Sequence, residues 1–141
     1  MSEPKAKGRR LAFGLGALQA FIGLGAVAGG LGLILDPSGA SLGISVEWLS
    51  GSPFPDYLFP GIVLFAINGI GSLAGSLASF MRYRYAGEFA VALGAFLILW
   101  IVAQVGWIGL SHWLQPLFFA LGVVELMLGG WLRRAWRTVR R

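Results

Sequence analysis

The run FAVALGAFLILWIVAQVGWIGL, residues 89–110, contains no charged residue and decides the fold class of this chain. Three further apolar blocks cover residues 11–35, 58–81 and 113–132. A helix rises about 1.5 Å per residue, so it needs roughly 20 apolar residues to cross a hydrocarbon core of about 30 Å, and each block reaches that length. The sequence therefore predicts an all-α integral membrane protein, a four-helix bundle that forms a single domain.

Composition and hydrophobic pattern exclude the main alternatives to a helical membrane protein. Hydrophobic residues make up 57% of the chain and charged residues 12%, and a water-soluble domain of 141 residues cannot bury so much apolar surface. Strands of a membrane barrel alternate apolar with polar side chains, which these blocks do not do. The first block is longer than the apolar core of a secretory signal, so we expect a retained span.

The basic residues predict the orientation of the four spans. All eleven Lys and Arg residues lie in segment 1–10, in the turn with Arg82 and Arg84, or in segment 133–141, which share one side of a four-span bundle. The loop 36–57, on the other side, carries none. Because Lys and Arg are retained in the cytoplasm, we expect both termini there and 36–57 as one larger outer loop.

The net charge of +5 has the same explanation. Basic residues that border membrane spans attract anionic lipid headgroups, at about 1 kcal/mol for each residue near the surface. We therefore expect the lipid bilayer, with anionic headgroups at the cytoplasmic face, to be the partner of the basic tails. Nucleic acid is not expected as a partner.

The connections between the spans carry weaker signals. The centre of the outer loop, residues 44–49, fits either a short strand or a helical turn at the membrane surface. The connections near Arg84 and near His112 are short. Spans two and three, and spans three and four, are therefore expected to be antiparallel neighbours.

Polar side chains inside the spans form the candidate site: Glu125, Asn68, Gln19 and Gln104. Counted inward from the nearest span boundary, Asn68 and Glu125 lie about 12–14 Å deep, and Gln19 reaches a similar depth. We therefore expect these three in one layer near the membrane midplane. Gln104 is expected nearer the outer surface.

Glu125 is the most informative of these residues, because an ionised carboxylate near the midplane costs at least a few kcal/mol. No Lys or Arg lies at its depth. We expect a neutral acid that is hydrogen-bonded to Asn68 or Gln19. Two interpretations stay open: a hydrogen-bonding group that links helices, and a site that handles protons or cations.

Small residues at helical spacing predict close helix packing, because 22 glycines are spread through the chain. The glycines expected at helix contacts are Gly16, Gly25, Gly29, Gly71, Gly75, Gly122 and Gly129. The stripes with Gly25 and Gly29, and with Gly71 and Gly75, face either a neighbouring helix or another subunit. A homo-oligomer or a larger membrane complex is therefore an open expectation.

No motif predicts catalysis, a cofactor or a metal ion. The chain has no cysteine, which excludes disulfides and thiolate metal sites. Residues 23–28, GLGAVA, match a dinucleotide-binding pattern but lie inside a span, where the required strand-to-helix turn is missing. His112 with Asp36, Glu47 and Asp56 has no ligand spacing on one element, so we favour a solvated histidine over a metal site.

The segment before the second span resembles a known pattern. Residues 52–61, SPFPDYLFPG, resemble a P-F-x-D-Y-x-x-P-G pattern in small, uncharacterised four-span bacterial membrane proteins. Residues 113–116, WLQP, are similar to the turn before the last span of those proteins. The resemblance implies the same topology and a bacterial inner-membrane location, and it implies no known activity.

Three classes of function are compatible with these observations. We rank first a non-enzymatic structural or accessory subunit, because the loops are minimal and no reactive constellation is present. The second is a small oligomeric transporter or channel for protons, cations or small solutes, lined by Glu125, Asn68 and Gln19. The third is a membrane enzyme, or a lipid- or quinone-binding protein, that uses the outer loop and His112.

The predicted orientation can be tested with single cysteines, because the chain has none of its own. A membrane-impermeant thiol reagent on intact cells is expected to label Ser52→Cys and to leave Thr138→Cys unlabelled until the cells are permeabilised. Labelling of position 138 but not of position 52 in intact cells would show that the orientation is reversed.

Overall fold

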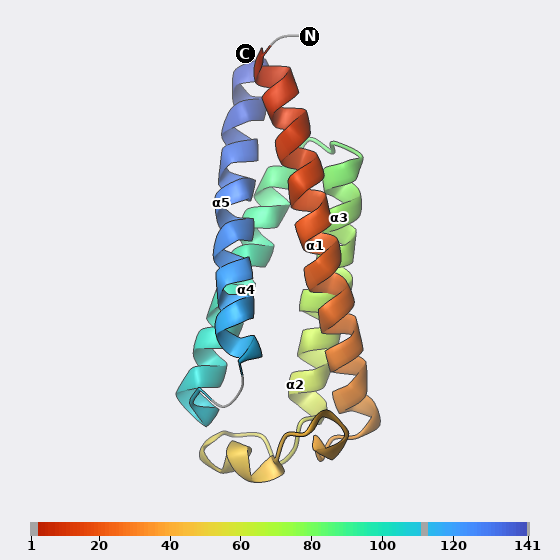
Figure 1. Cartoon of the computed structure of the whole chain (residues 1–141), viewed down its shortest axis with the longest axis vertical. Helices are drawn as coiled ribbons and strands as arrows, with labels where there is room; N and C mark the ends of the chain where they lie inside the picture. The colour runs from red at the N-terminus through yellow and green to blue at the C-terminus, as the bar shows by residue number, and fades with distance from the viewer. Residues whose placement is uncertain (1–2, 111–112, 141) are drawn as a thin grey trace.

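Four long helices lie side by side in the computed structural model, which describes residues 3–110 and 113–140 (Figure 1). The elements are α1 Glu3–Leu35, α2 Leu58–Val63, the π-helix η3 Leu64–Gly71, α3 Ser72–Phe80, α4 Ala86–Ile108 and α5 Leu114–Arg140. The segments α2, η3 and α3 follow one another without a break and form the second span. The stretches long and apolar enough to cross a membrane are Gly8–Leu35, Leu58–Phe80, Ala86–Trp107 and Leu114–Trp136. The all-α fold with four helices of membrane-spanning length is confirmed.

α1 and α5 continue beyond the apolar blocks into the basic segments 1–10 and 133–141. Their ends meet at one end of the bundle, here called the terminal end, and the loop 36–57 covers the opposite end, here called the loop end (Figure 1). The two extensions pack together, since a Cβ added at Gly8 would lie 2.7 Å from the indole nitrogen of Trp136. This contact explains why the helices do not stop where the apolar blocks stop.

α4 and α5 form a tight antiparallel hairpin whose backbones touch at glycines. A Cβ added at Gly87 would lie 2.9 Å from the carbonyl oxygen of Gly129, and one added at Gly94 would lie 2.9 Å from that of Gly122. The two contacts are seven residues apart on each helix, which is two helical turns. Backbones approach this closely only where no side chain separates them.

α1 and the second span form the other closely packed pair. A Cβ added at Gly30 would lie 2.7 Å from the backbone nitrogen of Phe65, and one added at Gly69 would lie 3.1 Å from that of Val27. α1 also packs along α5 and joins the two pairs.

Spans two and three are antiparallel, as expected, but they touch little. Their contact is concentrated at Leu93 of α4, whose methyl carbons would lie 3.2 Å from a Cβ added at Gly71 and 2.7 Å from one added at Gly75. Towards the loop end, α4 and α5 diverge from α1 and α2 (Figure 1). The short turn between spans two and three therefore makes these spans antiparallel but does not make them pack together along their length.

The exterior of the bundle is apolar and its interior is partly polar. Among the described residues, the large apolar side chains that are at least 60% exposed are Leu24, Leu35, Leu77, Met81, Leu99, Leu110 and Trp113. The buried polar side chains are Gln19, Asn68, Ser72, Ser76, Ser79, Gln115 and Glu125. In water this arrangement would be unfavourable, whereas in lipid only interior polar groups can find partners.

The loop 36–57 contains two short 3₁₀ turns, η1 Ala40–Leu42 and η2 Val46–Gly51. Of the two alternatives for residues 44–49, the structure has the helical turn. The hydroxyl oxygen of Ser45 accepts a hydrogen bond from the backbone N–H of Glu47 at 3.1 Å, which caps η2. Such a cap favours a helical start over a strand.

Adjacent glycines of α5 provide a matched test of the α4–α5 contact. Gly129→Leu is expected to destabilise the bundle by at least about 1–3 kcal/mol, the cost typical of overpacking. The reason is that a Cβ at this position would lie 2.9 Å from the Ala90 Cβ. A Cβ at Gly130 meets no atom within 4 Å, so Gly130→Leu is expected to change stability little. Equal losses for both variants in equilibrium unfolding in mild detergent would contradict the close contact.

Candidate functional site

The structure brings Gln19 of α1 and Glu125 of α5 together in the interior of the bundle. Both side chains are 0% exposed. The Gln19 amide lies within interaction range of the Glu125 carboxyl group. The expected hydrogen bond is nevertheless not formed, because both carboxyl oxygens and the Gln19 Nε2 have no hydrogen-bond partner among the described residues. The pair is therefore enclosed and unsatisfied.

Serines of α3 position Gln19 from the other side. The hydroxyl group of Ser79 donates a hydrogen bond of 2.7 Å to the Gln19 Oε1. One turn away, the hydroxyl group of Ser76 donates a hydrogen bond of 2.7 Å to the backbone carbonyl oxygen of Gly16. Both bonds cross from the second span to α1, where hydrocarbon leaves no competing partner. The Ser79 bond holds the Oε1 of Gln19 towards α3 and leaves its Nε2 for other contacts.

Asn68 does not lie in the same layer, which corrects the expectation of one polar layer near the midplane. Its neighbour Gly69 packs against Val27 of α1, whereas Gly75 packs against Gln19. Eight residues separate positions 19 and 27, which is about 12 Å along a helix. Asn68 is 1% exposed and its Nδ2 also has no hydrogen-bond partner among the described residues.

The stagger of the helices explains this difference. Gly61, in the first helical turn of the second span, packs against Leu33 of α1. Phe118, near the start of α5, faces Gly25 instead. α5 thus begins about two turns farther from the loop end than α2, as Figure 1 also shows. Equal counts from the two span starts therefore give unequal depths.

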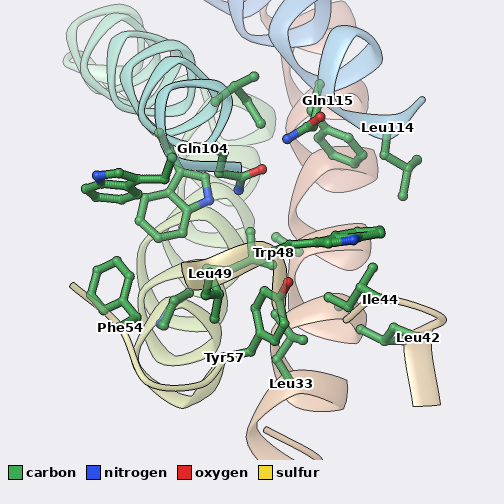
Figure 2. A pocket seen from close by; sticks show the side chains of 18 of the residues that line it. Leu33, Leu42, Ile44, Trp48, Leu49, Phe54, Tyr57, Gln104, Leu114 and Gln115 are labelled. Carbon is green, nitrogen blue, oxygen red and sulfur yellow. The ribbon is translucent and has the colours of Figure 1, made fainter. Parts of the chain in front are cut away.

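Gln104 lies apart from the other three polar residues and lines a pocket at the loop end. The pocket has a volume of about 330 Å³, is partly open, and is lined by α1, the second span, α4, α5 and the loop 36–57. Its walls are almost entirely apolar, and Gln104 and Gln115 are the amide side chains that reach it. Figure 2 shows these two amides with the ring of Trp48 reaching in from the loop. Nothing in the sequence pattern predicted this pocket.

The loop 36–57 lines the pocket and is held in place by contacts of its aromatic side chains. The hydroxyl group of Tyr57 donates a hydrogen bond of 2.7 Å to the carbonyl oxygen of Ser45, and burial raises the pKa of Tyr57. Phe54 packs edge-on against Trp107 of α4, with ring centroids 5.2 Å apart. Leu49 is buried with Tyr57 in the same cluster. The loop is therefore fastened to itself and to α4.

A tight turn at Asp36 starts the loop. The Asp36 carboxylate accepts hydrogen bonds from the Ser38 hydroxyl at 2.6 Å and from the Ser41 backbone N–H at 3.0 Å. These bonds lower the pKa of Asp36, and the bond from the Ser38 hydroxyl has the largest effect. Gly39 has φ of 79°, and a Cβ there would lie 2.5 Å from Ile44, so the turn requires glycine.

One donor in the pocket wall is unsatisfied. The indole nitrogen of Trp100 is buried and has no hydrogen-bond partner among the described residues. A buried N–H group without a partner costs about 1–3 kcal/mol. Because Trp100 lines the pocket, its wall contains this buried donor in addition to the amides of Gln104 and Gln115.

The glycines expected at helix contacts take different positions. Gly122 and Gly129 face the α4 backbone, Gly71 and Gly75 face Leu93, and Gly16 faces the ring of Phe80. Gly25 and Gly29 line the pocket. Gly87, Gly94, Gly30, Gly61 and Gly69 make contacts as close but were not singled out from the sequence. A glycine that faces a backbone has the same local sequence signal as one that faces lipid.

Metal ligands and basic residues add no second site. No group of three or more His, Cys, Asp or Glu side chains forms among the described residues, and His112 lies outside them. At the terminal end, the Nε of Arg133 lies 3.1 Å from the Glu88 carboxylate across α4 and α5. Both side chains are largely exposed, so this ion pair belongs to the surface.

The chain matches no protein-family model, no curated protein and no solved structure. The candidate sites are therefore argued from their own geometry.

A double-mutant cycle tests whether Ser79 and Gln19 are coupled. Ser79→Ala, Gln19→Leu and the double variant are expected to give a coupling energy of about 0.6–1.7 kcal/mol, the range measured for hydrogen bonds between membrane helices. The matched cycle of Ser76→Ala with Gln19→Leu should give less, because Ser76 donates to a backbone oxygen. Equal coupling in both cycles would contradict the assigned pairing.

Proposed function

We propose that this protein binds, within the membrane, a molecule that carries a hydrocarbon chain and a head group with a carbonyl oxygen. The pocket at the loop end supports this proposal most directly. Its volume of about 330 Å³ lies in the range of small-molecule sites, about 300–1,000 Å³. Of the three classes open from the sequence, lipid or quinone binding accounts for this pocket.

The surroundings of the pocket favour a hydrocarbon occupant. Apolar cavities stay free of water, because water finds no hydrogen-bond partners in them. The helices that form the walls are long and apolar enough to cross a membrane, so acyl and isoprenoid chains are the apolar molecules at hand. Burying one methylene group contributes about 0.8 kcal/mol. A chain that enters the pocket therefore gains contacts with protein in place of an empty volume.

Polar groups in the wall favour a head group that accepts hydrogen bonds. The Trp100 N–H is buried there without a partner, and the Gln104 amide lies in the same wall. A carbonyl oxygen of an ester or a quinone would satisfy the Trp100 donor, whereas a purely hydrocarbon molecule would leave it unpaired. The aromatic rings of the loop cover the same end of the pocket.

Orientation and location complete the proposal. With both termini in the cytoplasm of a bacterium, the pocket would open in the outer half of the inner membrane. Binding of this kind needs no catalysis and is compatible with an accessory role in a larger membrane complex.

A variant that fills the pocket tests the proposal. At Gly29, an added Cβ would make only ordinary contact, 3.6 Å from Leu64, so Gly29→Leu is expected to fold and to project into the pocket. Displacing about two methylene groups of a ligand would weaken binding roughly tenfold. Gly14→Leu on the same helix is the matched control, because nothing lies within 4 Å of its Cβ.

Native mass spectrometry from mild detergent, followed by solvent extraction, measures the retained molecules. The wild type and Gly14→Leu are expected to retain one molecule per chain, and Gly29→Leu clearly less, because its roughly tenfold weaker affinity lowers occupancy. The extracted mass distinguishes an acyl lipid from an isoprenoid quinone. A wild type without any retained molecule, or equal retention in Gly29→Leu, would refute ligand binding in the pocket.

A further inference from the structure

Glu125 has no countercharge in the part of the bundle where it is buried. In the membrane-spanning helices, the nearest charged groups on its own helix are Arg133 and Arg134, eight and nine residues away. Eight residues correspond to about 12 Å along a helix. Arg133 is paired with Glu88 at the surface. The Glu125 carboxyl group is therefore expected to bind a cation from outside the fold, either a proton or a metal ion, because an unpaired charge is costly in hydrocarbon.

No charged or titratable group faces Glu125 from the neighbouring elements. On α1 the nearby polar group is Gln19, and the second span contributes Gly75, Ser76 and Ser79 around it. On α4, which packs closely against α5, residues 89–108 contain no charged side chain. The described residues around this carboxyl group therefore provide no charged partner for it.

Gln19 is oriented so that it presents a donor to this region. Its Oε1 accepts the hydrogen bond from Ser79, and its Nε2 is buried without a partner. An amide N–H stabilises a carboxylate but repels a metal ion, which needs several oxygen ligands. The amide orientation thus favours an anionic Glu125 that forms when a proton leaves, over a site that holds a metal ion.

Buried apolar clusters lie on both sides of the pair, and the one towards the terminal end contains Ala12, Leu15 and Leu132. Ser79 belongs to the last turn of α3, so the hydrogen bond to Gln19 links the pair to the terminal end of the bundle. Towards the loop end, Ile22, Leu97 and Ile101 form a buried apolar cluster. Water that exchanges with the pair therefore has to pass buried apolar side chains on either side.

We propose that Glu125 and Gln19 form a proton-binding site inside the membrane, in which Glu125 exchanges a proton with water. The step is the transfer of a proton from hydronium to the Glu125 carboxylate, which leaves water and a neutral carboxylic acid. Gln19 is a positioning residue that donates its Nε2 hydrogen to the carboxylate when the proton is released. This site is separate from the pocket and does not depend on ligand binding there.

Infrared difference spectroscopy of the reconstituted wild type tests the proposal. The carbonyl stretching band of a protonated carboxyl group is recorded in steps from about pH 4 to about pH 10, where buried carboxyl groups titrate. A band that disappears as the pH rises, that shifts in D₂O and that is absent from Glu125→Gln is the expected result. Glu88→Gln, which changes an exposed carboxyl group of the surface ion pair, is the matched control and should retain the band.

Two further measurements separate the roles. Gln19→Met removes the N–H donor from the carboxylate, so the midpoint of the band should move to higher pH. An unchanged midpoint would overturn the part assigned to Gln19. A Glu125 band that persists at every pH without exchange in D₂O would show a locked acid and overturn the proposal. The same holds if no Glu125 band exists at any pH, or if Na⁺ at constant pH removes it while choline does not.

Discussion

The contact between the backbones of α4 and α5 determines much of the remaining architecture. Gly87 with Gly129, and Gly94 with Gly122, bring the two helices together over two turns. In lipid, apolar side chains give helices little reason to associate, so close van der Waals packing at small residues becomes the main attraction. α4 packs along α5 and contacts the second span mainly at Leu93. Because α4 packs against α5 more than against the second span, the α4–α5 pair and the pair of α1 with the second span separate at the loop end.

The pocket and the loop are consequences of that separation. A bundle with four equal helix contacts would fill its own interior, whereas here the hairpins diverge where α5 begins (Figure 1). The loop 36–57 supplies the missing wall with Leu49, Phe54 and Tyr57. Its shape depends on local hydrogen bonds at Asp36 and on the left-handed conformation of Gly39. Loop and helices therefore line the pocket together.

Buried polar groups without a partner among the described residues occur at both candidate sites and also at Asn68. Ser76 and Ser79 form short hydrogen bonds between helices, so their role in linking the helices explains why they are there. Glu125, the Nε2 of Gln19 and the indole nitrogen of Trp100 have no partner among the described residues. Replacing such groups with apolar ones would cost a purely structural bundle little. Their presence is therefore better explained by what they bind than by what they hold together.

The sequence by itself determined that the four apolar blocks lie in lipid, that they are helical, and approximately where each span begins and ends. The reason is that apolar blocks of about 20 residues have no other stable arrangement in a membrane. It also identified Glu125 and Gln19 as interior residues, since burial of such groups is costly unless a neighbouring helix or a ligand receives them. Only the tertiary structure decided that Asn68 lies near the level of Val27 and not of Gln19, that Gln104 belongs to a pocket, and which glycines face a backbone. These features depend on the stagger and divergence of helices, which arise from contacts between residues distant in the chain and leave no periodic signal within any one span.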